Sequence, residues 1–248
     1  MTEIKYDTLF EIETLDELGS VVAGPGKVPD WRTAFEIMPT SLTSKNLARL
    51  LFLNHVYQQI VNVHGVVMDF GTRYGTNAVV FSNLRSIYEP FNRHRKVVAF
   101  DTFEGFPSIS PEDGNSKLMT KGNLALPFGY DTILREILRL HEQLNPAPHV
   151  VKHEVIKGDV CETLLAYFKQ HPETIVALAY LDMDLYRPTK FVLEAIRTRL
   201  TRGSVVVFDE LCDQDSPGET QALIDAWGTQ YSSLCRVPWC SRTSYLVV

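Results

Sequence analysis

The chain has 248 residues, of which 45% are hydrophobic, so it is long enough to bury a substantial core as one domain. Its formal charge of −6 argues against binding to nucleic acid or to an anionic membrane, because phosphate groups require a basic surface. Neither a signal-peptide pattern nor an apolar run of about eighteen residues occurs. We therefore expect a cytoplasmic protein whose partner is a small molecule.

The first 40 residues differ in pattern from the rest of the chain. The triplet Gly24-Pro25-Gly26 breaks any period, so we expect residues 1–40 to form an irregular arm with at most a short helix near Leu15. Such an arm can cover the site or contact a partner subunit, and we expect a homodimer or higher homo-oligomer that assembles through it. Residues 41–248 are expected to form a single domain.

Helical and strand patterns alternate from residue 41 onwards. A helix is expected to begin near Ser41 and end near Ile60, and Gly203 is placed to end a later helix that has Pro188 in its first turn. The alternation indicates an α/β, Rossmann-like fold, in which helices cover both faces of a mostly parallel sheet and a hairpin ends the chain. The expected strands are 66–70, 96–101, 150–157, 175–181 and 204–208, the helices 78–87, 132–144, 161–170, 191–200 and 219–230, and the hairpin 234–239 with 244–248.

A strand, a glycine turn and a helix start occur together at residues 66–75 (VVMDFGTRYG). The spacing, Asp69-x-Gly71-x-x-x-Gly75, differs from the Gly-x-Gly-x-x-Gly pattern of dinucleotide sites. Glycines allow the backbone to approach a ligand closely, and N–H groups at a helix start hold anionic groups. An acid at the strand end suits a cofactor with a cationic amino group, such as S-adenosylmethionine. An ordinary strand-to-helix turn is the competing interpretation.

Acidic residues follow each of the five expected parallel strands, where open α/β sheets bind their ligands. Asp101 is the candidate acceptor for ribose hydroxyls, and Asp159 is either a helix N-cap or an acceptor for an adenine amino group. Carboxylates in one crevice repel one another unless a cation binds there, which indicates a hard divalent ion such as Mg²⁺. The acids at these strand ends are Asp69, Asp101, Asp159, Asp182, Asp184, Asp209 and Glu210.

Residues 102–130 are rich in glycine, proline, serine and asparagine. The segment is too polar for a core element and too long for a simple connection. We expect a lid-like insertion that closes over the substrate.

Five segments occur in an order that is informative as a set: 69–75 (DFGTRYG), 100–107 (FDTFEGFP), 158–160 (GDV), 181–186 (LDMDLY) and 207–210 (VFDE). Together they resemble the macrocin O-methyltransferase family, whose members use S-adenosylmethionine and a metal to methylate deoxysugars of antibiotics. The resemblance covers roughly residues 40–230. It implies a class I methyltransferase fold, a seven-stranded sheet with an antiparallel C-terminal strand.

The resemblance also implies site residues. It makes Asp182, Asp209 and Glu210 the magnesium ligands, and the family usually has a second Asp where this chain has Glu210. The family has a His that serves as general base before residues 124–126 (LAL), whereas this chain reads KLMTKGN at 117–123. The candidate bases are therefore Lys117, Lys121 and Tyr130. The expected cofactor-binding residues are Asp69, Gly71, Thr72, Arg73, Gly75, Asp101, Thr102, Asp159 and Asp182.

The function we expect is transfer of a methyl group from S-adenosylmethionine to a deoxysugar hydroxyl, on an antibiotic glycoside or a nucleotide sugar. Tyr186 and Lys190 match the spacing of short-chain dehydrogenases, but we expect Pro188 to break the helix between them, and a dinucleotide glycine motif is missing. Asp182-Met183-Asp184 also matches the metal motif of a glycosyltransferase, which leaves the turn at 69–75 unexplained. A cofactor-binding module that has lost its base is the non-enzymatic alternative.

Overall fold

The computed structural model describes residues 9–23, 30–230, 233–240 and 242–248. The chain divides into two compact units, one that ends at Arg49 and one that spans Leu50–Val248. Within the described ranges, no helix is long and apolar enough to cross a lipid bilayer.

The first unit is helical. It contains α1 (Leu9–Ala23), α2 (Trp31–Ile37) and the 3-10 helix η1 (Met38–Ser41). Asp30 caps α2, because its Oδ1 accepts hydrogen bonds from the backbone N–H groups of Arg32 at 2.8 Å and Thr33 at 3.1 Å. The expectation of at most a short helix near Leu15 is wrong, since the glycine and proline breakers follow α1 instead of interrupting it.

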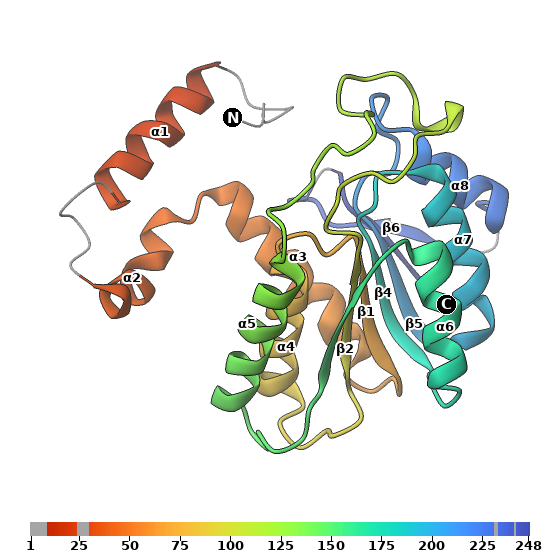
Figure 1. Ribbon diagram of the computed structural model, residues 1–248, viewed down its shortest axis with the longest axis horizontal. Coiled ribbons are helices and arrows are strands. Elements are labelled where there is room, and N and C mark those ends of the chain that lie inside the picture. Colours follow the sequence, from red (N-terminus) through yellow and green to blue (C-terminus); the bar gives the residue numbers. More distant parts are fainter. Residues whose placement is uncertain (1–8, 24–29, 231–232, 241) are drawn as a thin grey trace. The chain divides into compact units, whose positions relative to one another are not determined.

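The second unit is built on a sheet whose described strands lie in the order β3-β2-β1-β4-β5-β7-β6 (Figure 1). Strands β1 to β5 pair in parallel, and β7 pairs antiparallel with both β5 and β6. The strand order reverses between β1 and β4, so the ligand crevice is expected at their carboxyl ends. The bounds are β1 (Val66–Phe70), β2 (Val97–Asp101), β3 (His153–Lys157), β4 (Val176–Leu181), β5 (Leu200–Phe208), β6 (Leu234–Arg236) and β7 (Ser244–Val247). The predicted seven-stranded sheet with an antiparallel C-terminal strand is confirmed.

Helices cover both faces of the sheet (Figure 1). Alternating side chains of β1 point to opposite faces: Val67 packs with α3, α4 and α5, whereas Met68 and Phe70 pack with α6, α7 and α8. Each face therefore has its own apolar layer, as the alternating sequence pattern predicts. The helices are α3 (Ser44–Ile60), α4 (Thr76–Tyr88), α5 (Tyr130–Leu144), α6 (Val160–Gln170), α7 (Tyr186–Ile196) and α8 (Gly218–Ala226), with the 3-10 helices η2 (Pro111–Asp113) and η3 (Arg197–Arg199).

One boundary differs from the expectation. Helix α7 ends at Ile196, and β5 begins at Leu200, where it pairs with Val176 of β4. Gly203 lies inside the strand with φ +92°, and its N–H donates to the Val248 carbonyl at 2.6 Å. Residues at the expected end of the helix therefore belong to the sheet, and Gly203 does not end the helix.

A buried ionic network joins α4, α5 and β3 at the amino end of the sheet. Glu142 Oε1 lies 2.8 Å from Arg85 Nη2 and 2.7 Å from Lys152 Nζ, and Glu142 Oε2 lies 3.3 Å from His153 Nδ1. Burial raises the pKa of Glu142, but hydrogen bonds from His153 and Lys152 and the charges of Arg85 and Lys152 outweigh it and lower the pKa to about 2. Glu142 is therefore a buried carboxylate whose charge is balanced by its neighbours.

Candidate active site

The turn between β1 and α4 is packed against the end of β4. Gly71 has φ +81°, and a Cβ added to it would lie 1.9 Å from the backbone oxygen of Asp182. Gly75 has φ +83°, and its added Cβ would lie 2.1 Å from a methyl carbon of Leu134 on α5. Both glycines are needed for the packing of the turn itself, because the protein's own atoms fill the space beside them. The expected close approach of their backbone to a cofactor stays a prediction.

Asp69 organises this turn from inside the sheet. Its side chain has no exposed surface, and it accepts hydrogen bonds from the Thr72 hydroxyl at 2.5 Å and from Asn77 Nδ2 at 3.3 Å. Thr72 is itself buried. The two expected cofactor residues are thus held against each other, and direct contact of Asp69 with a cofactor stays a prediction.

Asp101 joins the same turn to the start of the insertion. Its Oδ2 accepts from the Arg73 N–H at 2.7 Å, and its Oδ1 accepts from the Phe103 N–H at 2.6 Å. Burial raises the pKa of Asp101, and the two N–H groups and the Arg73 charge oppose that rise without cancelling it. Arg73 has φ +49°, a conformation that is uncommon for a residue other than glycine, and its guanidinium lies 5.0 Å from the centre of the Tyr74 ring. The structure therefore brings the predicted residues at the ends of β1 and β2 into one hydrogen-bonded unit.

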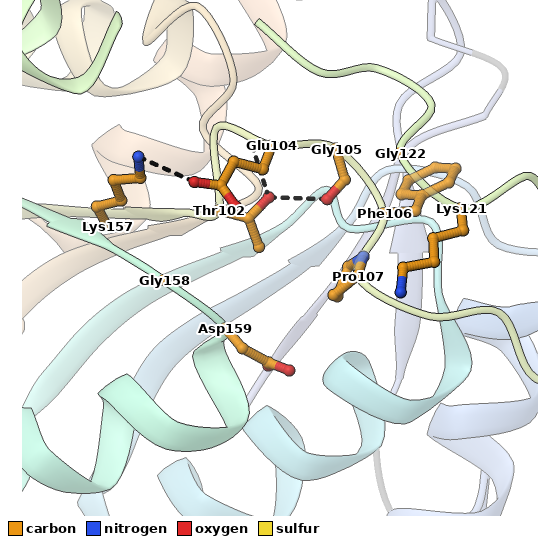
Figure 2. Close-up of a pocket in the computed structure, with 10 residues that line it drawn as sticks. All are labelled: Thr102, Glu104, Gly105, Phe106, Pro107, Lys121, Gly122, Lys157, Gly158 and Asp159. Atoms are coloured by element: carbon orange, nitrogen blue, oxygen red, sulfur yellow. Dashed lines mark hydrogen bonds and ion pairs between the residues drawn. The ribbon is translucent and has the colours of Figure 1, made fainter. Parts of the chain in front are cut away.

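A pocket of about 350 Å³ lies between the insertion and the turn after β3 (Figure 2). Asp159 in its wall caps α6, because its Oδ1 accepts from the Cys161 N–H at 2.9 Å. The insertion is linked to the end of β3 by an ion pair, in which Glu104 Oε1 of the insertion lies 3.1 Å from Lys157 Nζ of β3. The N-cap interpretation of Asp159 is confirmed, and its position in the pocket wall leaves the adenine interpretation open as a prediction. The lining residues are Thr102, Glu104, Gly105, Phe106, Pro107, Lys121, Gly122, Lys157, Gly158 and Asp159.

A cluster of acidic residues, which we call the acidic cluster, lies at the carboxyl ends of β4 and β5. Its members are Asp182, Asp184, Asp209, Glu210 and, from α8, Glu219. Tyr180 donates its hydroxyl proton to Asp209 Oδ1 at 2.7 Å, and the Glu210 N–H donates to Glu219 Oε2 at 3.1 Å. Most of these side chains are buried, so their mutual repulsion is only weakly screened by water.

Glu219 is the member that the sequence analysis missed. Its side chain is completely buried, and its pKa is raised well above the usual range, first by burial and then by the charges of Asp209, Asp184 and Asp182. The pattern placed it only at the start of a helix, where acids commonly interact with the helix dipole. Local sequence therefore contained no sign that Glu219 faces the ends of β4 and β5.

Arg242, which precedes β7, brings a positive charge to this region. It forms ion pairs with Glu210 and, at 3.7 Å, with Asp213. The Oε2 atom of Glu210 is buried and has no hydrogen-bond partner among the described residues. Within those residues, no group of three or more His, Cys, Asp or Glu side chains is arranged as a metal site. The role of Asp182, Asp209 and Glu210 as magnesium ligands stays a prediction.

The insertion is folded and has its own small core. Its two ends are joined by the bonds from Phe106 N–H to the Asn123 carbonyl at 3.0 Å and from Gly122 N–H to the Phe106 carbonyl at 2.9 Å. Phe106 and Met119 pack on Leu185, which precedes α7. The segment is therefore anchored to the elements that carry the acidic cluster.

The three candidate bases lie in different places. Lys121 is exposed and lines the pocket, whereas Lys117 is exposed and is not among the lining residues. Tyr130 begins α5, and its hydroxyl donates to the Tyr74 carbonyl at 3.4 Å, beside the β1–α4 turn. The structure thus does not gather these side chains into one group, and their roles stay predictions.

Pro188 does not separate Tyr186 from Lys190, contrary to the expectation on which the dehydrogenase alternative was partly excluded. Tyr186 and Lys190 both lie on α7, and Lys190 Nζ donates to the Tyr186 hydroxyl at 3.1 Å. Pro188 does not break the helix, because it stands in the first turn, where a backbone N–H has no helical partner. The missing dinucleotide motif remains the valid objection.

The seven-stranded sheet, with its strand order and antiparallel C-terminal strands, is that of a class I methyltransferase. The family model described as macrocin-O-methyltransferase (TylF) matches residues 30–223, and the chain belongs to this family. It is an O-methyltransferase by homology, which excludes the glycosyltransferase interpretation of Asp182-Met183-Asp184. A comparison with curated proteins found no match.

Solved structures agree with this assignment. A crystal structure of CalS11, described as calicheamicin methyltransferase, is 37% identical with a TM-score of 0.93, over 98% of this chain and 94% of that chain. An apo structure of CalS11, described as a TDP-rhamnose 3′-O-methyltransferase in calicheamicin biosynthesis, is 35% identical with a TM-score of 0.85, over 98% and 96%. The O-methyltransferase NovP, at 17% identity and a TM-score of 0.58 over 95% of this chain and 98% of that chain, shares the fold.

Proposed function

We propose that the protein transfers a methyl group from S-adenosylmethionine to a hydroxyl of a deoxysugar, with a nucleotide-linked sugar such as TDP-rhamnose as the first acceptor to test. The observation that carries the proposal is the extent of the similarity to CalS11, which covers 98% of this chain at 35% identity. A finished antibiotic glycoside is the second acceptor class to test, because the description of the family names macrocin as its acceptor.

The cofactor fits the carboxyl ends of β1, β2 and β3. Asp101 supplies a carboxylate at the end of β2, and Asp159 lies in the wall of the pocket beside it. In nucleoside-binding α/β folds, an acid at the second strand accepts hydrogen bonds from the ribose. We assign the remaining contacts to the turn at 71–75 and to Thr102, whose hydroxyl donates to the Gly105 carbonyl at 2.8 Å in the pocket wall.

The acidic cluster fits a hard divalent ion. Its donors are oxygen atoms, and the Oε2 atom of Glu210 is buried with no hydrogen bond from the described residues, although Oε1 pairs with Arg242. We propose that Asp182, Asp209 and Glu210 hold Mg²⁺, which requires Glu210 to share or release Arg242. When bound, the ion supplies Lewis-acid polarisation of a pair of vicinal hydroxyls.

The residues of the chain then have separate tasks. Methyl transfer requires the acceptor oxygen to lie in line with the sulfonium methyl, so the turn at 69–75 must hold the cofactor and the insertion must exclude water. A base must also accept the hydroxyl proton. We rank Lys121 first because it lines the pocket, and we retain Lys117 and Tyr130 as candidates.

Calorimetry and a methyl-transfer assay test the function. We expect saturable binding of S-adenosylmethionine, no binding of NAD, and transfer to TDP-rhamnose that is lost after EDTA treatment and restored by Mg²⁺. Asp101→Asn should weaken cofactor binding, whereas Glu162→Gln, an exposed carboxylate on α6, is the matched control. Tight NAD binding, or methylation of catechols but of no sugar, would refute the proposal.

Substitution of each candidate base tests the proton acceptor. Lys121→Met should lower turnover with little change in cofactor affinity, and Lys117→Met and Tyr130→Phe are measured beside it. Full turnover in all three variants would exclude these side chains as the base. Binding of the cofactor without transfer to any sugar in the panel would instead favour a binding module that lacks catalysis.

We also propose that two or more copies associate through the N-terminal arm. Support comes from two exposed apolar side chains of the arm, Phe35 and Met38, which are 72% and 52% exposed in the single chain. Light scattering should report a dimer or larger species for the wild type and a smaller species for Phe35→Glu. A monomeric wild type would refute this assembly.

A further inference from the structure

Asp113 stands at the end of η2, at the tip of the insertion, and its side chain is only 1% exposed. A buried carboxylate is costly unless its oxygens receive hydrogen bonds. Asp113 Oδ2 accepts from the Ser110 N–H at 2.6 Å and from the Ser110 hydroxyl at 2.8 Å. The bond from the Ser110 N–H, together with the bond that the Ser110 side chain accepts from the Asp113 N–H, forms a capping box within the tip itself.

The other oxygen of Asp113 forms a hydrogen bond with a residue outside the insertion. Its Oδ1 accepts from the backbone N–H of Tyr186 at 2.5 Å, across 73 positions of sequence. Tyr186 is the first residue of α7, and the N-cap residue of that helix, Leu185, provides no side-chain hydrogen bond. Asp113 therefore supplies from the insertion the cap that α7 lacks.

Helix α8 is built to accept this contact. A Cβ added to Gly218 would lie 2.7 Å from Asp113 Oδ1, 2.7 Å from the Tyr186 nitrogen and 2.9 Å from the Asp184 oxygen. The next residue, Glu219, belongs to the acidic cluster, as does Asp184. The Asp113 carboxylate thus contacts the first residues of α7 and α8. Each of these residues lies one or two positions in sequence from a member of the acidic cluster.

We infer that Asp113 is a positioning residue: it ties the tip of the insertion to the acidic cluster and thereby sets how the insertion covers the acceptor. The inference rests on the proposed function. A purely local role in closing the 3-10 turn requires only the contacts with Ser110, so it does not explain the bond to Tyr186 or the need for glycine at position 218.

Three variants test the tie. Asp113→Ala removes it, Asp113→Asn keeps one oxygen for the Tyr186 N–H, and Glu112→Gln changes the exposed neighbour on the same 3-10 helix. In Asp113→Ala we expect the KM for TDP-rhamnose to rise at least about tenfold, while the affinity for S-adenosylmethionine changes less than about threefold. Asp113→Asn should lie between it and the wild type, and Glu112→Gln should match the wild type.

Amide hydrogen exchange gives a readout that needs no activity. The Tyr186 amide should exchange about tenfold faster in Asp113→Ala and at the wild-type rate in Glu112→Gln. Unchanged exchange overturns the tie, and an equal loss of affinity for acceptor and cofactor overturns its positioning role. A wild type that methylates no acceptor defeats the proposed function alone, and exchange then decides the tie. If Asp113→Ala does not fold, Asp113→Asn decides by the same measurements.

Discussion

Two buried groups of charged residues lie at opposite ends of the same sheet, and they differ in balance. At the amino end, Glu142 is in contact with the cations of Arg85 and Lys152, and its pKa is lowered to about 2. At the carboxyl end, the acidic cluster gathers five carboxylic acids, and Arg242 is the cation that pairs with Glu210 in the described part of the chain.

The difference separates a structural role from a functional one. A balanced network stabilises the fold only while every member is present, because the loss of one leaves a buried charge uncompensated. An unbalanced cluster instead stores repulsion that a bound cation relieves. Glu142 and Glu219 are both fully buried glutamates, but their pKa values are shifted in opposite directions.

The largest effect is expected when the balanced network is broken. Glu142→Gln leaves Arg85 and Lys152 buried without a carboxylate, which should destabilise the protein by roughly 3–5 kcal/mol and lower Tm by about 10 °C. Thermal melts should show this, and the folded variant should keep its methyl-transfer activity. Glu136→Gln on the same helix, where water screens the exposed Arg139 pair, should leave Tm unchanged within the error of the melt. Equal effects of the two substitutions would contradict the comparison.

Acid titration sharpens the same contrast. The folded-state pKa of Glu142 is about 2 and the ordinary value is 4.5, so its contribution is present above pH 4.5 and is lost as the pH falls toward 2. The loss amounts to about 3 kcal/mol, obtained from the difference between these two pKa values. Urea unfolding between pH 6 and pH 3 should have a shallower pH dependence in Glu142→Gln than in the wild type. Parallel curves would show that other groups control acid unfolding.

A divalent cation should stabilise the acidic cluster at the carboxyl end of the sheet. Saturation with Mg²⁺ at about 100 times its Kd should add about 2–3 kcal/mol to the wild type, measured as a shift in Tm between EDTA and MgCl₂. Asp209→Asn still offers an oxygen to Tyr180 but lacks the charge, so its shift should be less than half as large. Glu194→Gln, an exposed carboxylate on α7, should keep the wild-type shift. No shift in the wild type would count against a magnesium site.

The smallest effect is expected at Glu219. Its raised pKa means that folding favours the protonated form, so its contribution to stability is greatest below pH 4.5 and decreases as the pH rises through the folded-state pKa. Glutamine mimics that protonated form without taking up a proton, so Glu219→Gln should be no less stable than the wild type at neutral pH in EDTA, and slightly more stable as the pH rises. Destabilisation as large as that of Glu142→Gln would mean that Glu219 is a balanced carboxylate after all.

The sequence was sufficient where the signal is local. The apolar run at 66–70, the glycines that follow it and the acids at the ends of the strands were enough to predict the sheet and the turn after β1, because strand burial and turn chemistry depend on a few adjacent residues. The prediction needed correction where a helix and a strand can both use the same residues. Strand β5 takes Leu200 from the expected helix because Val176 is there to pair with it.

The sequence was insufficient where partners are distant. Arg85 and Glu142 are 57 positions apart, and Asp113 and Tyr186 are 73 apart. A charged residue read alone is assigned to the solvated surface, so neither the network nor the buried Glu219 had a local pattern to reveal it.

The bond from Asp113 to α7 also bears on attempts to exchange acceptor preference between relatives. A chimera that replaces residues 102–130 alone transplants Asp113 without the start of α7 that holds the Tyr186 N–H in place and without the Gly218 that leaves room for the carboxylate. The segments that must be exchanged together are therefore not contiguous in sequence: they are the insertion and the first turns of α7 and α8. Recombination at the ends of the insertion would produce a loop attached at its neck but not at its tip.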